Sequence, residues 1–131
     1  MVNFGWNPKV FMASLSAPEI GPGEQKAVTL GGKRLTESSI SASLPALSMI
    51  VNNSSYGEIK VILNGDDGNS FNVPAGALMP FSGYPVTDIT VRGLTPAVTT
   101  DAGDVTFTLL NDMAETLRFY ECKKRGLVPY V

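Results

Sequence analysis

Residues Tyr56 to Gly93, YGEIKVILNGDDGNSFNVPAGALMPFSGYPVTDITVRG, decide the fold. Near the start of this stretch Ile59, Val61 and Leu63 alternate with residues that are mostly polar. Alternation with a period of two is typical of an antiparallel strand that is buried on one face. The pattern therefore predicts a β-strand here, with its aliphatic side chains turned toward a core.

The chain is then expected to reverse. Residues 64–69 (NGDDGN) are Asn, Gly and Asp, which tolerate the positive φ angles of tight turns. Phe71 and Val73 resume the alternation until Pro74, which cannot donate to a sheet hydrogen bond and marks an end or an edge. After a Pro-Gly corner and a looser segment, residues 86–92 (VTDITVR) predict a third strand.

Further strands are predicted on both sides of this stretch. They cover residues 25–30 (QKAVTL), 47–52 (LSMIVN), 104–111 (DVTFTLLN) and 115–122 (ETLRFYEC), with 36–46 as a loop or a weak edge strand. The pair 104–111 and 115–122 predicts a β-hairpin. No long segment shows a helical period. We therefore expect an all-β fold, an antiparallel β-sandwich or jelly-roll-like barrel of about seven or eight short strands with little helix.

A chain of 131 residues predicts one domain. We divide it into an N-terminal arm (residues 1–24), a β-sandwich domain (25–122) and a C-terminal tail (123–131). The first segment scatters apolar side chains among Gly, Asn, Pro and Ser, so it either packs across its own sheet or reaches onto a neighbour. The tail, KKRGLVPYV, is basic and then apolar.

The composition excludes several classes of protein. Charged residues make up 17% of the chain, against about 25% in an average protein, which favours an oligomer or an assembly component. The net charge of −2 argues against a nucleic-acid binder. The absence of histidine excludes His-based zinc sites and Ser-His-Asp triads. Cys122, the one cysteine, cannot form an intramolecular disulfide and is interpreted as a buried or incidental thiol.

Neither a membrane span nor a signal peptide is expected. No apolar run approaches the roughly 18 residues that a span needs. Polar residues, glycine and proline interrupt the N-terminal twenty residues, where a signal peptide would have a continuous apolar block. We therefore expect synthesis in a cytoplasm and no membrane partner.

Three groups of residues were weighed for chemistry. The loop 64–69 offers oxygen ligands for calcium, but it lacks the closing carboxylate of an EF-hand and matches hairpin-turn composition. Asp101 and Asp104 are a possible acid/base pair, although such chemistry needs two carboxylates held across a cleft. Aromatic side chains form a candidate platform for sugar, or else pack in the core or between subunits. These are Trp6, Tyr56, Phe81 and Tyr84. We expect no enzyme, no cofactor and no bound metal.

Residues 59–93 resemble a pattern found in small virion proteins of tailed bacteriophages. The pattern is a strand that ends near Asn64-Gly65, a Val-Pro-Ala-Gly corner at 73–76, and a Pro-Val-Thr-x-Ile-x-Val strand at 85–91. The resemblance covers about a quarter of the chain. It implies a β-sandwich that assembles on a capsid or tail as a decoration, cement or spike component, often as a trimer. No binding residues can be carried over from it.

Our first hypothesis is therefore a virion structural protein of the capsid decoration type, made in the host cytoplasm. Its expected partners are itself, as a homotrimer, and a major capsid protein. Arms suit this role because binding can order them onto an adjacent subunit. The residues expected to bind partners are Phe4, Trp6, Phe11, Leu127, Val128 and Tyr130. The alternative is a carbohydrate- or receptor-binding β-sandwich module of a tail or spike.

Overall fold

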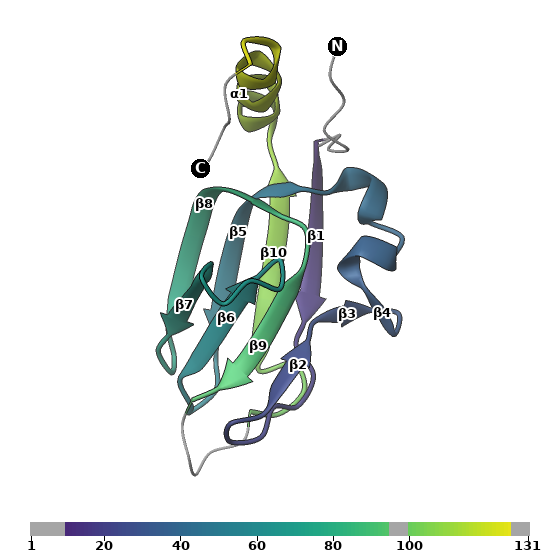
Figure 1. Ribbon diagram of the computed structural model, residues 1–131. Helices are drawn as coiled ribbons and strands as arrows, with labels where there is room; N and C mark the ends of the chain where they lie inside the picture. The colour runs from purple at the N-terminus through teal and green to yellow at the C-terminus, as the bar shows by residue number, and fades with distance from the viewer. Residues whose placement is uncertain (1–9, 95–99, 127–131) are drawn as a thin grey trace.

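The computed structural model describes residues 10–94 and 100–126, which fold into two antiparallel sheets packed face to face (Figure 1). The first sheet contains, in spatial order, β1 (Phe11–Ser16), β10 (Val105–Asn111), β5 (Ala46–Asn53) and β8 (Leu78–Val86). The second contains β2 (Gln25–Ala27), β9 (Ile89–Gly93), β6 (Ile59–Leu63) and β7 (Ser70–Val73). The remaining elements are β3 (Thr29–Leu30), β4 (Lys33–Arg34), the 3₁₀ turns η1 (Leu35–Glu37) and η2 (Ser41–Ser43), and the helix α1 (Met113–Lys124).

The two sheets together are one long hairpin that has been folded over. Its centre is the turn between β6 and β7, and strands at matching positions on either side of that turn pair with each other. Thus β6 pairs with β7, β5 with β8, β2 with β9, and β1 with β10. Successive pairs alternate between the sheets, which is the topology of a jelly roll. The predicted all-β fold is confirmed as an antiparallel sandwich, and its two sheets do not close into a barrel.

The core lies between the sheets and is aliphatic and aromatic. Along β10, Val105, Phe107 and Leu109 are fully buried, while Thr106 and Thr108 point away from the core. Along β6, Ile59, Val61 and Leu63 belong to the core as predicted, although Ile62 is buried as well. Each such side chain stabilises the fold by about 1.5–3 kcal/mol.

Buried asparagines fasten the chain where strands end. Asn53, at the end of β5, donates from Nδ2 to the carbonyl oxygens of Gly57 (2.8 Å) and Val73 (3.2 Å). Asn111, at the end of β10, accepts from the backbone N–H of Leu47 (2.6 Å) and donates to the Pro45 carbonyl (2.9 Å). These bonds satisfy backbone groups that would otherwise be buried without partners.

The connection from β2 to β5 packs along one side of the sandwich, next to β1 (Figure 1). Leu35 and Leu44 of this connection are buried in the core, and Leu30 and Ile40 pack against it. Arg34 is paired with Asp88 at 3.0 Å, which ties the connection to the link between β8 and β9. The segment 36–46, predicted as a loop or weak edge strand, lies in this connection, which contains the two 3₁₀ turns η1 and η2. We call the connection, residues 28–45, the plug, because it covers this side of the sandwich.

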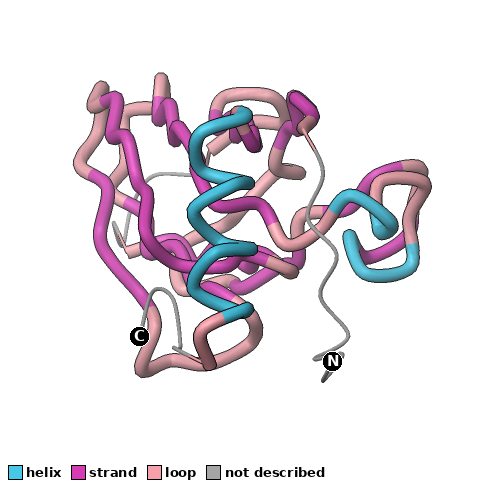
Figure 2. Tube along the Cα trace, turned by 90° about the horizontal axis from the view of Figure 1, so that it is seen from above, coloured by secondary structure: helices cyan, strands magenta, loops and turns pink. Residues whose placement is uncertain are grey.

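The predicted strand at 115–122 is wrong, because these residues belong to α1. Asp112 caps the helix: its Oδ1 accepts from the backbone N–H of Glu115 at 2.7 Å. Gly126, with φ of 73°, follows the last turn, as glycine commonly does after a helix. Viewed from above, α1 lies across the end of the sandwich (Figure 2). Only Thr116 and Phe119 among its described side chains are buried.

Besides the two-residue strand β4, two strands of the first sheet were not predicted from the sequence. Residues 11–16 of the predicted arm form β1, so the sandwich begins well before residue 25. Residues 78–85, predicted as loose, form most of an edge strand, β8, in which Pro80 and Pro85 are tolerated because one side of the strand is unpaired. The predicted strand at 86–92 is shifted, since Val86 ends β8 and β9 begins at Ile89.

The face assignment can be tested by substituting Phe107. We expect Phe107→Ala to lower the free energy of unfolding by about 3–5 kcal/mol, because it opens a cavity in the core. Asn72→Ala, at an exposed position on β7, should change it by less than about 0.5 kcal/mol. Urea denaturation followed by circular dichroism measures both, and equal costs would show that Phe107 is not a core residue.

Candidate functional site

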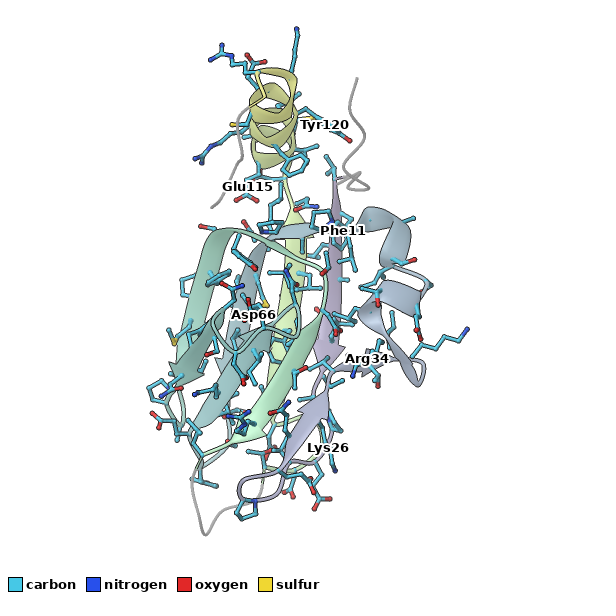
Figure 3. All side chains as sticks on the ribbon, viewed as in Figure 1. Phe11, Lys26, Arg34, Asp66, Glu115 and Tyr120 are labelled. Atoms are coloured by element: carbon cyan, nitrogen blue, oxygen red, sulfur yellow. The ribbon has the colours of Figure 1, made fainter. Side chains whose placement is uncertain are left out.

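Five of the six residues expected to bind partners lie outside the described residues: Phe4, Trp6, Leu127, Val128 and Tyr130. The sixth, Phe11, begins β1, is half-buried and packs against the core of its own domain. Figure 3 shows Phe11 and Tyr120 at the end of the molecule where α1 lies. The described chain begins and ends there too, at Val10 and Gly126 (Figure 1).

The carboxylates of loop 64–69 are engaged in the turn itself. Asp66 accepts from the backbone N–H of Gly68 at 2.9 Å and from Nδ2 of Asn69 at 3.1 Å. Asp67 lies 3.6 Å from the guanidinium of Arg92. Within the described part of the chain no three His, Cys, Asp or Glu side chains gather as metal ligands. The geometry supports a turn, which was the preferred interpretation of this loop.

Asn64 fixes the start of the same loop. It has a positive φ of 55°, and its Oδ1 accepts from the backbone N–H groups of Thr87 (2.7 Å) and Asp88 (3.1 Å). Its Nδ2 donates to the carbonyl of Pro85 at 2.9 Å. One side chain thus joins the turn between β6 and β7 to the link between β8 and β9.

The acidic pair Asp101 and Asp104 also closes a turn. The backbone N–H of Asp101 donates to Oδ2 of Asp104 at 3.0 Å, and the N–H of Asp104 donates to the carbonyl of Asp101 at 3.1 Å.

The pKa of another carboxyl group, that of Glu24, is lowered, chiefly by its hydrogen bond with the Lys26 ammonium and then by the Gly21 N–H. A general acid at neutral pH needs a raised pKa instead.

The outer face of the first sheet is uncharged. It presents three rows of side chains, and each row runs across β1, β10, β5 and β8 in register. The rows are Met12–Leu110–Ser48–Ser82, Ser14–Thr108–Ile50–Pro80 and Ser16–Thr106–Asn52–Leu78. We call these residues the neutral face. Met12 and Leu78 are 76% and 63% exposed at opposite corners of it.

The outer face of the second sheet has a different character. One of its rows runs Gln25–Arg92–Lys60–Asn72 and carries two cations. Arg92 donates to the side-chain oxygen of Gln25 at 2.9 Å and also faces Asp67. Both sheets have four antiparallel strands, yet only the second carries charged side chains in these rows. The absence of charge from the neutral face is therefore due to its amino-acid sequence, because the same fold accommodates charged residues on the other sheet.

Helix α1 extends the neutral face at one end. Ser48, in the end row, hydrogen bonds to Oε1 of Glu115 in the first turn of the helix at 2.5 Å. Met113 and Leu117 are each 60% exposed on α1, and Val10, just before β1, is 55% exposed. Cys122, on the same helix, is a half-buried free thiol. Exposed apolar side chains are therefore present on α1 and just before β1, at the end of the molecule where Glu115 bonds to Ser48 of the neutral face.

A pocket lies between β7 and β8, at the side of the sandwich opposite the plug. Its volume is about 180 Å³. It is lined by Leu63, Gly68, Asn69, Ser70, Phe71, Phe81 and Tyr84. Two members of the predicted aromatic platform, Phe81 and Tyr84, meet here. Tyr56 is 92% exposed in the connection between β5 and β6, at the other end of β6, and Trp6 lies outside the described residues.

Comparison with known proteins gave no relative, since neither a protein-family model nor a curated protein matches the sequence. Among residues 10–94 and 100–126, no helix has the length and apolarity that crossing a membrane requires. The neutral face and the pocket are the two surfaces of the described residues that bear on function.

Asn64 provides a test of the turn interpretation. We expect Asn64→Ala to cost about 3–5 kcal/mol of stability, because it removes four hydrogen bonds at about 1 kcal/mol each, one of them from the Thr87 hydroxyl, and leaves a Cβ residue at positive φ. Asn64→Gly loses the same bonds without the backbone strain, so it should be about 1 kcal/mol more stable than the alanine variant. Urea denaturation measures the difference, and an alanine variant as stable as the natural protein would contradict this role.

Proposed function

We propose that the protein is a structural component of a virion, a decoration or cement protein that works as a homo-oligomer. The observation that carries this proposal is the neutral face. Charged residues are depleted at the centre of protein interfaces, and large exposed apolar patches mark contact surfaces. A sheet face without one charged side chain, continued by the exposed Met113 and Leu117, fits such a surface.

The chemistry of the face favours a second copy of the chain as its partner. An uncharged surface offers no electrostatic complement to a charged partner, but it is complementary to another uncharged surface. The exposed apolar side chains of a second copy, such as Met113 and Leu117, offer such a surface and are present wherever the protein is made. In a trimer the neutral face of one subunit would pack on this different surface of the next subunit, because pairing of identical faces gives a dimer. Symmetric association of identical subunits is also the commonest form of oligomer.

The size of the face indicates that the interface includes more than the sheet. Four strands about 4.8 Å apart and rows spanning about 17 Å give a flat area of roughly 300 Å². A stable interface needs about 800 Å² per partner. We propose that α1 and the apolar chain ends, including Phe4, Trp6, Leu127, Val128 and Tyr130, supply the rest.

Two further observations support a virion role. The jelly-roll topology is used by many viral shell proteins, although a fold does not determine a function. Residues 59–93 resemble small virion proteins of tailed phages, as noted above. The mechanism we propose is mechanical: homotrimers bound to a major capsid protein add contacts across the shell, and rupture requires that these contacts be broken.

Thr108→Lys tests the neutral face, because Thr108 lies in its middle row between Ser14 and Ile50. We expect the natural protein to have the mass of an oligomer, three chains for a trimer, and the variant to shift toward one chain. A buried, unpaired lysine would cost several kcal/mol at the interface. Multi-angle light scattering after gel filtration gives both masses.

The matched control is Asn72→Lys, which adds the same charge to the outer face of the other sheet. It should leave the mass unchanged, and both variants should melt within a few degrees of the natural protein. A natural protein that is monomeric at high concentration would contradict the proposal, as would equal effects of the two lysines.

The virion role has its own test. Antibodies against the purified protein should label intact particles isolated from the source culture by density gradient, seen by immunogold electron microscopy. The protein should also be present in those particles at a fixed ratio to the major capsid protein. Its presence in the lysate and absence from the particles would refute the virion role.

A further inference from the structure

We propose that the pocket between β7 and β8 binds one neutral sugar ring, an activity that does not depend on the virion role. The pocket lies at the side of the sandwich where the edge strand of each sheet ends the layer, β8 in the first sheet and β7 in the second. The opposite side is plugged by the connection that carries the buried Leu35. On the pocket side the aromatic residues stay half-buried, so part of their surface is left accessible.

Aromatic rings from both sheets build the pocket. Phe71 of β7 and Phe81 of β8 stack with centroids 5.1 Å apart and planes at 10°. Tyr84 meets Phe81 edge to face at 6.5 Å. Ring faces carry partial negative charge, and they attract the slightly positive C–H groups that line one face of a pyranose.

Polar groups stand beside these rings. Asn69 donates from Nδ2 to the hydroxyl oxygen of Tyr84 at 2.6 Å and to Oδ2 of Asp66 at 3.1 Å. These two bonds fix the orientation of the amide, and its Oδ1 is an acceptor for a ligand hydroxyl. Because the Tyr84 oxygen accepts from Asn69, its own O–H can be donated. The pocket thus offers one donor and one acceptor next to an aromatic surface.

The volume and charge of the pocket restrict the ligand. A cavity of about 180 Å³ is smaller than the roughly 300–1,000 Å³ of pockets for drug-sized molecules, so it accommodates about one ring. No residue in its lining is charged, which favours a neutral ligand over a sialic or uronic acid. A neutral pyranose has an apolar face for the rings and hydroxyls for Tyr84 and Asn69.

Saturation-transfer difference NMR tests the proposal with the methyl glycosides of glucose, galactose, mannose, N-acetylglucosamine and N-acetylgalactosamine. We expect at least one of them to give a saturable signal. Tyr84→Phe removes only the hydroxyl and should weaken binding about 3- to 10-fold. Phe71→Leu replaces a stacking ring with a similar apolar volume and should weaken binding by a similar factor. Circular dichroism melting verifies that both variants are folded.

Tyr56→Ala is the matched control, because Tyr56 is the most exposed described aromatic residue and lies away from the pocket. It should leave the affinity unchanged. Absence of a saturable signal from every glycoside would overturn the proposal, as would loss of binding in Tyr56→Ala alone. If Phe71→Leu changes the oligomeric mass and no sugar binds, the pocket receives a side chain of a neighbouring subunit and the proposal is wrong.

Discussion

The structure depends on the pairing register that starts at the turn between β6 and β7. Every other strand pair is added outward from this turn, so its geometry is transmitted to β1 and β10 at the far ends of the hairpin. Asn64 holds the turn by bonding to the link between β8 and β9, two strands away along the chain. A slip of one residue would turn Phe107 outward and Thr108 inward, because side chains alternate along a strand. The core and the neutral face are therefore set by the same constraint.

The strands at the centre of the sheets could be predicted from sequence, as could the edge strands β2 and β7, but the edge strands β1 and β8 could not. Strands β6 and β10 have partners on both sides, the buried residues of β10 alternate throughout, and Ile59, Val61 and Leu63 of β6 face the core. The edge strands β1 and β8 tolerate an exposed methionine and two prolines, which weakens the pattern on which prediction relies. The helix was missed because Leu117 and Phe119 imitate alternation, whereas the cap at Asp112 decides the outcome.

Neither candidate surface has a local signature. The neutral face brings Met12 next to Leu110, 98 residues later in the chain, so this face becomes visible only when the register is known. The serines and threonines that form it read individually as ordinary strand residues. From the sequence, Phe71 was predicted only as part of a strand, and Tyr56 was a candidate for the aromatic platform. The structure places Phe71 against Phe81 and leaves Tyr56 at the other end of β6. Aromatic composition suggested a platform but did not identify the residues that meet in the pocket.

The positions of the two surfaces make the two proposed activities compatible. Strand β8 contributes to both: Pro80 and Ser82 point outward on the neutral face, while Phe81, between them, points inward to the pocket. A partner packed on the face of the first sheet would approach β8 from outside. The pocket is lined by residues of β7, of the inward side of β8 and of the turn between β6 and β7, and by none of the neutral face. Subunits assembled through the neutral face would then keep their pockets exposed, and a shell built from them would present many weak sugar sites whose combined affinity exceeds that of one.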